Sequence, residues 1–123
     1  MAINYEFQLD GKILIVTAKG KDDNLEQTMS YAHAILTHSI ENECTEVLCD
    51  ERELEYSLSV IDTFELAETA SQNARSIKKI AIVCDQKYLK DGNFYETVAQ
   101  NRGLTVKVLT DYNEAMKWLK QNG

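Results

Sequence analysis

Two stretches of this chain, KILIVTAK at positions 12–19 and KIAIVCD at positions 79–85, are apolar on both faces of an extended strand. Central strands of a parallel sheet have this pattern because helices bury both of their faces. Shorter strand-like runs lie at positions 47–49 and 104–109. Each of these runs precedes a segment in which apolar residues recur at helical spacing. This alternation predicts an α/β fold with right-handed crossovers.

The start of the chain follows a different pattern. Apolar and polar residues alternate from Ile3 to Leu9, which is typical of a half-buried strand. Asp10 and Gly11 come next, a pair that favours a tight hairpin because both positions tolerate positive φ. We therefore expect an N-terminal antiparallel hairpin on a mixed, mostly parallel sheet, in the order β-β-α-β-α-β-α-β-α. The length of 123 residues favours a single domain over residues 1–123.

Capping residues and periodicity predict where the helices begin and which sides they bury. We expect Asp22 or Asp23 to cap the first helix. The second is expected to begin at Ser59, where Asp62 completes a pair resembling a capping box. Helical spacing predicts the inner face of the first helix, which consists of Leu25, Met29, Ala32, Leu36 and Ile40.

The segment DERELE at positions 50–55 is predicted to be a charged turn, between a short strand that ends at Asp50 and the second helix. Ligands of open α/β sheets bind beyond the carboxyl ends of the strands, so Asp50, Ser57 and Ser59 are candidate site residues. The start of a helix offers free amides and a positive dipole, so a phosphorylated serine there would gain hydrogen bonds. The alternative is that Ser59 is only a helix cap and Ser57 only a loop residue.

Composition excludes several classes of protein. The net charge of −7 disfavours nucleic acid as a partner, because phosphate binding needs clustered Lys and Arg. The apolar runs are far shorter than the roughly 20 residues of a membrane span, so no integral membrane protein is expected. The N-terminal residues do not form a signal peptide, and the expected location is the cytoplasm. Three cysteines without a CxxC pair, Cys44, Cys49 and Cys84, are expected to be buried and reduced.

Motifs of common enzymes are missing from the chain. GxGxxG, GxxxxGK[ST], GxSxG and CxxC do not occur, and neither histidine has the spacing of a metal ligand. We therefore expect no cofactor and no metal. An enzyme would have to use Asp50 and Glu51 with His33 or His38, and these form no recognisable set of nucleophile, base and orienting group. We expect a protein that is not an enzyme.

Asp50 also has the position of the phosphate-accepting aspartate in a response-regulator receiver. A receiver needs an acidic pair directly after its first parallel strand, and Asp22 and Asp23 come late for that role. It also needs a lysine after the last strand, where this chain has Val108, Leu109 and Thr110. The receiver alternative is therefore the weaker one.

The layout and the C-terminal segment VLTDYNEAMKWL, Val108 to Leu119, resemble the STAS domain, the fold of anti-sigma factor antagonists, and within it the SpoIIAA-like branch. The resemblance implies a regulatory or protein-interaction module with a protein partner. In such modules a kinase phosphorylates a serine in a DSSG-like turn at the start of the second helix. The corresponding stretch here, residues 57–61, lacks the Asp and Gly of that turn, so Ser57 and Ser59 are the residues that could take the role.

The SpoIIAA-like branch is also similar to the lipid-carrying CRAL-TRIO fold, which implies a small apolar ligand as the alternative function. The candidate lining of such a pocket is aromatic and consists of Tyr56, Phe64, Tyr88, Phe94 and Tyr95. These side chains would equally serve as ordinary core. A homodimer is a further possibility, because the first strand is expected at the edge of the sheet with unpaired backbone groups.

Overall fold

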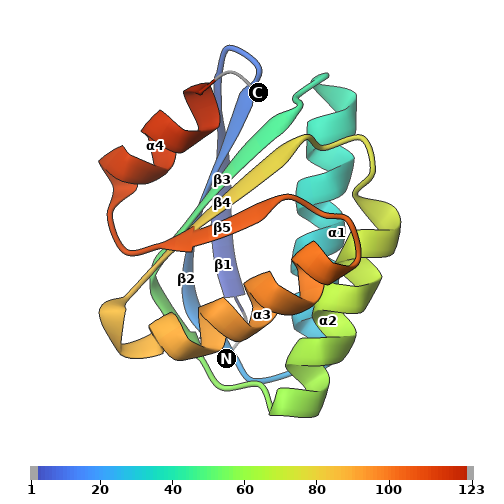
Figure 1. The fold of residues 1–123 in the computed structure, drawn as a ribbon, viewed down its shortest axis with the longest axis vertical. Helices are drawn as coiled ribbons and strands as arrows, with labels where there is room; N and C mark the ends of the chain where they lie inside the picture. The colour runs from blue at the N-terminus through green and yellow to red at the C-terminus, as the bar shows by residue number, and fades with distance from the viewer. Residues whose placement is uncertain (1–2, 122–123) are drawn as a thin grey trace.

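Among residues 3–121, which the computed structural model describes, the strands form one five-stranded sheet in the order β1-β2-β3-β4-β5 (Figure 1). The strands are β1 (Ile3–Asp10), β2 (Ile13–Asp22), β3 (Glu46–Tyr56), β4 (Lys79–Cys84) and β5 (Val106–Leu109). β1 pairs with β2 antiparallel, and the remaining neighbours are parallel. The predicted mixed α/β sheet with an N-terminal hairpin is confirmed.

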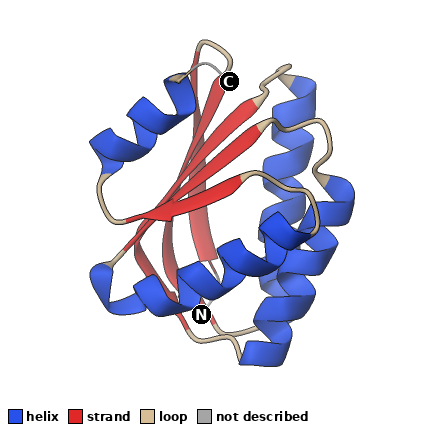
Figure 2. Cartoon of the chain, viewed as in Figure 1, coloured by secondary structure: helices blue, strands red, loops and turns tan. Residues whose placement is uncertain are grey.

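Helices cover both faces of this sheet (Figure 2). They are α1 (Leu25–Glu41), α2 (Val60–Asn73), α3 (Leu89–Asn101), α4 (Tyr112–Lys120) and the short 3₁₀ helix η1 (Gln86–Tyr88). Because the parallel strands follow one another in spatial order, right-handed crossovers place α1, α2 and α3 on the same face (Figure 1). α4 follows the last strand and covers the opposite face.

Each face of the sheet has its own apolar core. The larger core lies under α1, α2 and α3 and includes Leu14, Val16, Val47 and Cys49. The smaller core lies under α4, where Leu48, Ala81 and Val83 meet Ala115 and Leu119. Successive residues of a strand point to opposite faces, so the runs that are apolar on both sides fill both cores.

The charged segment 50–55 does not form the predicted turn. It continues β3 as far as Tyr56, because β2 is long enough to pair with it up to the Asp22–Tyr56 pair. Its outward-facing charges lie at the surface, where Arg52 binds Asp50 at 2.8 Å. Asp50 therefore lies inside a strand and not at the end of one.

The buried side of α1 also differs from the prediction. Thr28, Tyr31, Ile35 and Ser39 are the buried residues of this helix, while Ile40 is 58% exposed. The Thr28 and Ser39 hydroxyls donate to the carbonyls of Asn24 and Ile35, so these polar side chains are buried at little cost. Because these buried residues are polar, a search of the sequence for apolar residues at helical spacing does not find them.

The helix starts are partly as predicted. Asn24, and not Asp22 or Asp23, caps α1, since β2 extends through Asp22. Ser59 caps α2 by accepting the Asp62 amide, as predicted. α3 begins at Leu89, directly after the 3₁₀ helix η1.

The three cysteines are buried free thiols. Within residues 3–121, no helix combines the length and the apolar character that a membrane crossing requires.

Candidate functional site

A β-bulge in β3 organises the polar end of the site. Thr17 of β2 pairs with Asp50, but Lys19 pairs with Glu53, so Glu51 and Arg52 together lie opposite one residue of β2. A bulge of this kind interrupts the alternation of a strand, so that beyond it the side chains point to the opposite faces of the sheet. Before the bulge the odd-numbered residues of β3 face α1, and after it the even-numbered ones do, which places Glu51 and Tyr56 in the same core region.

Glu51 is the buried acid of this region, with 8% of its surface exposed. The Tyr31 hydroxyl donates to Oε2 at 2.7 Å, and the Tyr56 hydroxyl donates to Oε1 at 2.5 Å. Burial raises the pKa of Glu51, although the two tyrosine hydrogen bonds partly oppose the rise. Tyr31 comes from α1 and Tyr56 from the end of β3, so the carboxyl group ties a helix to the sheet.

Asp22, the last residue of β2, lies at the same end and is 9% exposed. Its Oδ1 accepts the backbone amide of Ser57 at 2.8 Å. Burial raises the pKa of Asp22 to about 7, the Ser57 hydrogen bond lowers it, and the charges of Glu51 and Asp91 raise it further. Part of the Asp22 population is therefore protonated at neutral pH.

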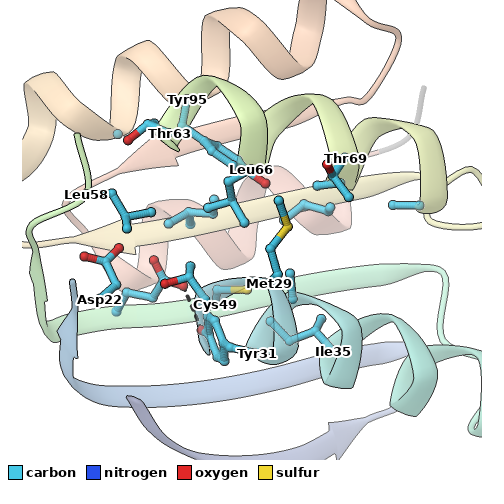
Figure 3. A pocket seen from close by; sticks show the side chains of 18 of the residues that line it. Asp22, Met29, Tyr31, Ile35, Cys49, Leu58, Thr63, Leu66, Thr69 and Tyr95 are labelled. Carbon is cyan, nitrogen blue, oxygen red and sulfur yellow. Dashed lines mark hydrogen bonds between the residues drawn. The ribbon is translucent and has the colours of Figure 1, made fainter. Parts of the chain in front are cut away.

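A cavity of about 350 Å³ extends from these acids between the helices and the sheet. Figure 3 shows α1 and α2 forming facing walls, with Met29 and Leu66 directed into the space between them. The sheet forms the floor, which includes Cys49, Ile82 and Val108. The volume lies within the range of small-molecule sites, about 300–1,000 Å³.

Acidic side chains gather at one end of the cavity. Asp22, Glu51 and Tyr56 line it near the carboxyl ends of β2 and β3, and Asp91 of α3 lines the same end. Ile77 and Ile80 line the other end, beside Thr69 and Asn73 of the last turns of α2. This arrangement suits a molecule with a largely apolar body and a polar group directed at the acids.

The candidate phosphoacceptor residues lie outside the cavity lining. Asp50 is bound by Arg52. Ser59 is the N-cap of α2. The Ser57 hydroxyl donates to Glu55 at 3.4 Å, while its backbone amide binds Asp22. The structure brings only the backbone of Ser57 to the polar end.

Two of the five aromatic residues proposed as a pocket lining, Tyr56 and Tyr95, line the cavity. Tyr88 packs against Tyr56 with the two rings tilted and their centroids 5.5 Å apart. Phe94 packs on the core cluster, and Phe64 is 39% exposed beneath Arg102.

Sequence reasoning missed Glu51, Asp22 and Tyr31 as members of one site. The signal for Glu51 was present, because it follows Val47 and Cys49 at a spacing of two. That spacing puts it on the buried face of a strand. Asp22 and Tyr31 had no comparable signal, since a strand end and a half-apolar helix position are common surface features.

Comparisons with known proteins agree on the fold. No family model matches the chain, and no curated protein matches its sequence. Among solved structures it is similar to an anti-sigma factor antagonist from Mycobacterium paratuberculosis, with a TM-score of 0.69, 8% identity and coverage of 98% of this chain and 96% of that one. It is also similar to a DUF3478-family protein with a SpoIIAA-like fold from Shewanella loihica PV-4, with a TM-score of 0.62, 18% identity and coverage of 96% and 94%. The predicted SpoIIAA-like, STAS-like fold is thereby confirmed, and at these identities the likeness shows the fold alone.

Proposed function

We propose that this protein is a non-enzymatic module that binds a small apolar molecule in the cavity between α1, α2, α3 and the sheet. The observation that carries the proposal is the cavity itself, about 350 Å³ with an apolar floor and with acidic side chains at one end. Small-molecule sites have this composition.

The apolar lining of the cavity supports an occupant. Water can enter the cavity, and apolar surface left in contact with water costs about 25 cal/mol per Å². A molecule whose apolar body displaces that water removes this cost and gains dispersion contacts with the walls.

The positions of the histidines favour binding over catalysis. Glu51 accepts hydrogen bonds from two tyrosines. His38 stacks on Phe7 with ring centroids 4.3 Å apart. His33 lies exposed on α1, where its ring Nε2 lies 3.5 Å from the Thr37 hydroxyl. Within the part of the chain that the structure describes, neither histidine is hydrogen-bonded to Glu51. Glu51 therefore lacks the histidine partner that would form a general acid–base pair with it.

A titration with 1-decanol, followed by amide chemical shifts of the labelled protein, tests the proposal. We expect shifts at Met29, Leu66 and Ile80, which line the cavity. Ala70→Phe, which inserts a ring from α2 into the cavity, should weaken decanol binding at least tenfold. Gln72→Phe adds the same ring on the exposed side of the same helix and should leave binding unchanged.

The result that would overturn the proposal is absence of saturable binding, or equal binding by the two phenylalanine variants. If Ala70→Phe does not fold, Ala32→Phe replaces it, because Ala32 lines the cavity from α1. Circular dichroism establishes folding before either comparison is made.

A protein-interaction role is the second candidate, and a separate surface favours it. Val60 and Ile61 in the first turn of α2 are 69% and 76% exposed, next to the Ser59 cap. Asp62 and Glu65 follow on the same helix, so the surface suits an apolar protein patch with a basic rim. The fold similarity to an anti-sigma factor antagonist points in the same direction.

A quantitative pull-down from cells of the source organism tests this role. The double variant Val60→Ser, Ile61→Ser should lose a partner that the unmodified chain retains, whereas Leu9→Ser, an exposed apolar residue on β1, should retain it. Identical captured proteins for the two variants would contradict the second candidate.

A further inference from the structure

We infer that the molecule in the cavity is elongated and carries a cationic hydrogen-bond donor, such as a protonated amine, at the end that meets Asp22 and Glu51. This inference rests on the proposed function and adds the chemical class of the ligand.

The shape of the cavity follows from the strand register. Glu51 pairs with Cys84, and Val47 pairs with Ile80. Ile80 and Ile82 of β4 line the cavity, and Ile80 lies four residues from the level of Glu51, which is about 13 Å at roughly 3.3 Å per residue. An elongated apolar body fits this length of floor.

Hydrogen-bonding capacity at the polar end favours a donor. The hydroxyl hydrogens of Tyr31 and Tyr56 are already given to Glu51, whose oxygens retain free lone pairs. Oδ2 of Asp22 accepts no hydrogen bond from another residue within 3–121 and keeps contact with the open cavity, although the residue as a whole is only 9% exposed. Neutral groups that both donate and accept, such as the Tyr95 hydroxyl, also line the cavity.

Charge excludes an anion more strongly than it excludes a neutral group. Asp22, Glu51 and Asp91 line the cavity, and the basic side chain in its lining is that of His33, which is exposed on α1. A carboxylate or phosphate head group would meet acidic side chains there, and it would be repelled by each of them that is ionised. An ammonium group would meet opposite charges there.

A bare metal ion fits the same end less well. No three His, Cys, Asp or Glu side chains between residues 3 and 121 are arranged to hold a metal ion. A metal would also leave the apolar length of the cavity empty. An amine on an apolar body satisfies both ends at once.

Protonation gives the inference an independent signature. Burial raises the pKa of Asp22 to about 7, with Glu51 and Asp91 adding to the rise. A cation binds the ionised form better, so its affinity should increase as the pH rises from 6 to 8. A neutral hydroxyl should show a smaller increase, because it gains a stronger hydrogen bond from the ionised acid but no charge attraction.

Isothermal titration calorimetry of the full chain with decylamine, decanol and decanoate tests the inference, at concentrations where none forms micelles. Alkyl ammonium groups, like lysine, are charged at neutral pH. At pH 8 we expect decylamine to bind at least tenfold more tightly than decanol, with decanoate the weakest. Asp22→Asn should reduce the preference for decylamine over decanol to threefold or less. Glu53→Gln, which removes an exposed charge from the neighbouring strand β3, should preserve it.

The outcomes separate this inference from the proposed function. If decanol and decylamine bind equally well, or decanoate binds best, the cationic head group is refuted and the apolar site stands. If none of the three binds, the proposed function itself fails. If Asp22→Asn does not fold, the affinities of the unmodified chain for decylamine and decanol are compared at pH 6 and pH 8 instead. A ratio of decylamine affinity to decanol affinity that does not rise with pH refutes the inference.

Discussion

Asp22 should make the stability of this protein fall as the pH rises through the neutral range. An acid whose pKa is raised by folding holds its proton more tightly in the folded state. The free energy of unfolding therefore decreases as the pH rises from the unfolded pKa of Asp22, 3.8, toward its folded pKa of about 7, and levels off above that.

The structure sets the size of this effect. A pKa difference of one corresponds to about 1.4 kcal/mol, so the difference at Asp22 corresponds to at most about 4 kcal/mol. The carboxyl group borders a cavity that water can enter, and solvation there reduces the cost of ionisation. We expect about 2 kcal/mol of stability to be lost between pH 5 and pH 8.

Asp22→Asn isolates this contribution, because asparagine still accepts the Ser57 amide but does not ionise. Urea unfolding of both proteins, followed by far-UV circular dichroism, gives the free energy of unfolding at each pH. The stability of Asp22→Asn minus that of the unmodified chain should rise by about 2 kcal/mol from pH 5 to pH 8. Glu51 and Asp91 face the same group and are present in both proteins.

Glu53→Gln is the matched control, and its difference from the unmodified chain should stay constant with pH. The reasoning would be refuted if Asp22→Asn also gave a constant difference. It would equally be refuted if the difference fell as the pH rose, because that sign requires an acid whose pKa is lowered by folding.

Two further predictions concern the same core. Tyr31→Phe removes the donor to Glu51 and should lower the free energy of unfolding by about 1–3 kcal/mol in urea, whereas Tyr88→Phe should change it little; equal losses would contradict the role of the buried hydrogen bond. Gly92→Ala places a Cβ 2.7 Å from Val108 Cγ1 and should cost about 1–3 kcal/mol by overpacking. Combining it with Val108→Ala should cost less than the sum of the two single losses, and strict additivity would show that the two positions do not clash.

The order of the elements could be predicted because it depends on local signals. The strands that are apolar on both faces, the Asp10-Gly11 turn and the Ser59 cap each act over a few residues. The structure has the same strand order, hairpin and cap. Right-handed crossovers then leave few choices of topology.

The polar end of the cavity could not be predicted because it depends on long-range contacts. The charges of segment 50–55 favoured a solvated turn, and only the length of β2 makes that segment a strand. Glu51 is then buried against Tyr31, twenty residues earlier in the chain. The Asp22 side chain is held by the amide of Ser57, thirty-five residues away. Separations of this size leave no periodic trace in a sequence.

The β-bulge at Glu51 and Arg52 lets β3 contain one residue more than the matching part of β2. If β3 kept all its residues and paired with β2 without the bulge, alternation would turn Leu54 and Tyr56 away from the core, and Glu51 would lose its Tyr56 hydrogen bond. Deletion of the exposed Arg52 removes the bulge but leaves Leu54 and Tyr56 on the core side, because a single residue of β3 would then lie between the Thr17–Asp50 and Lys19–Glu53 pairs. The loss of one residue should therefore be tolerated better at the bulge than elsewhere in β3, where no irregularity absorbs it.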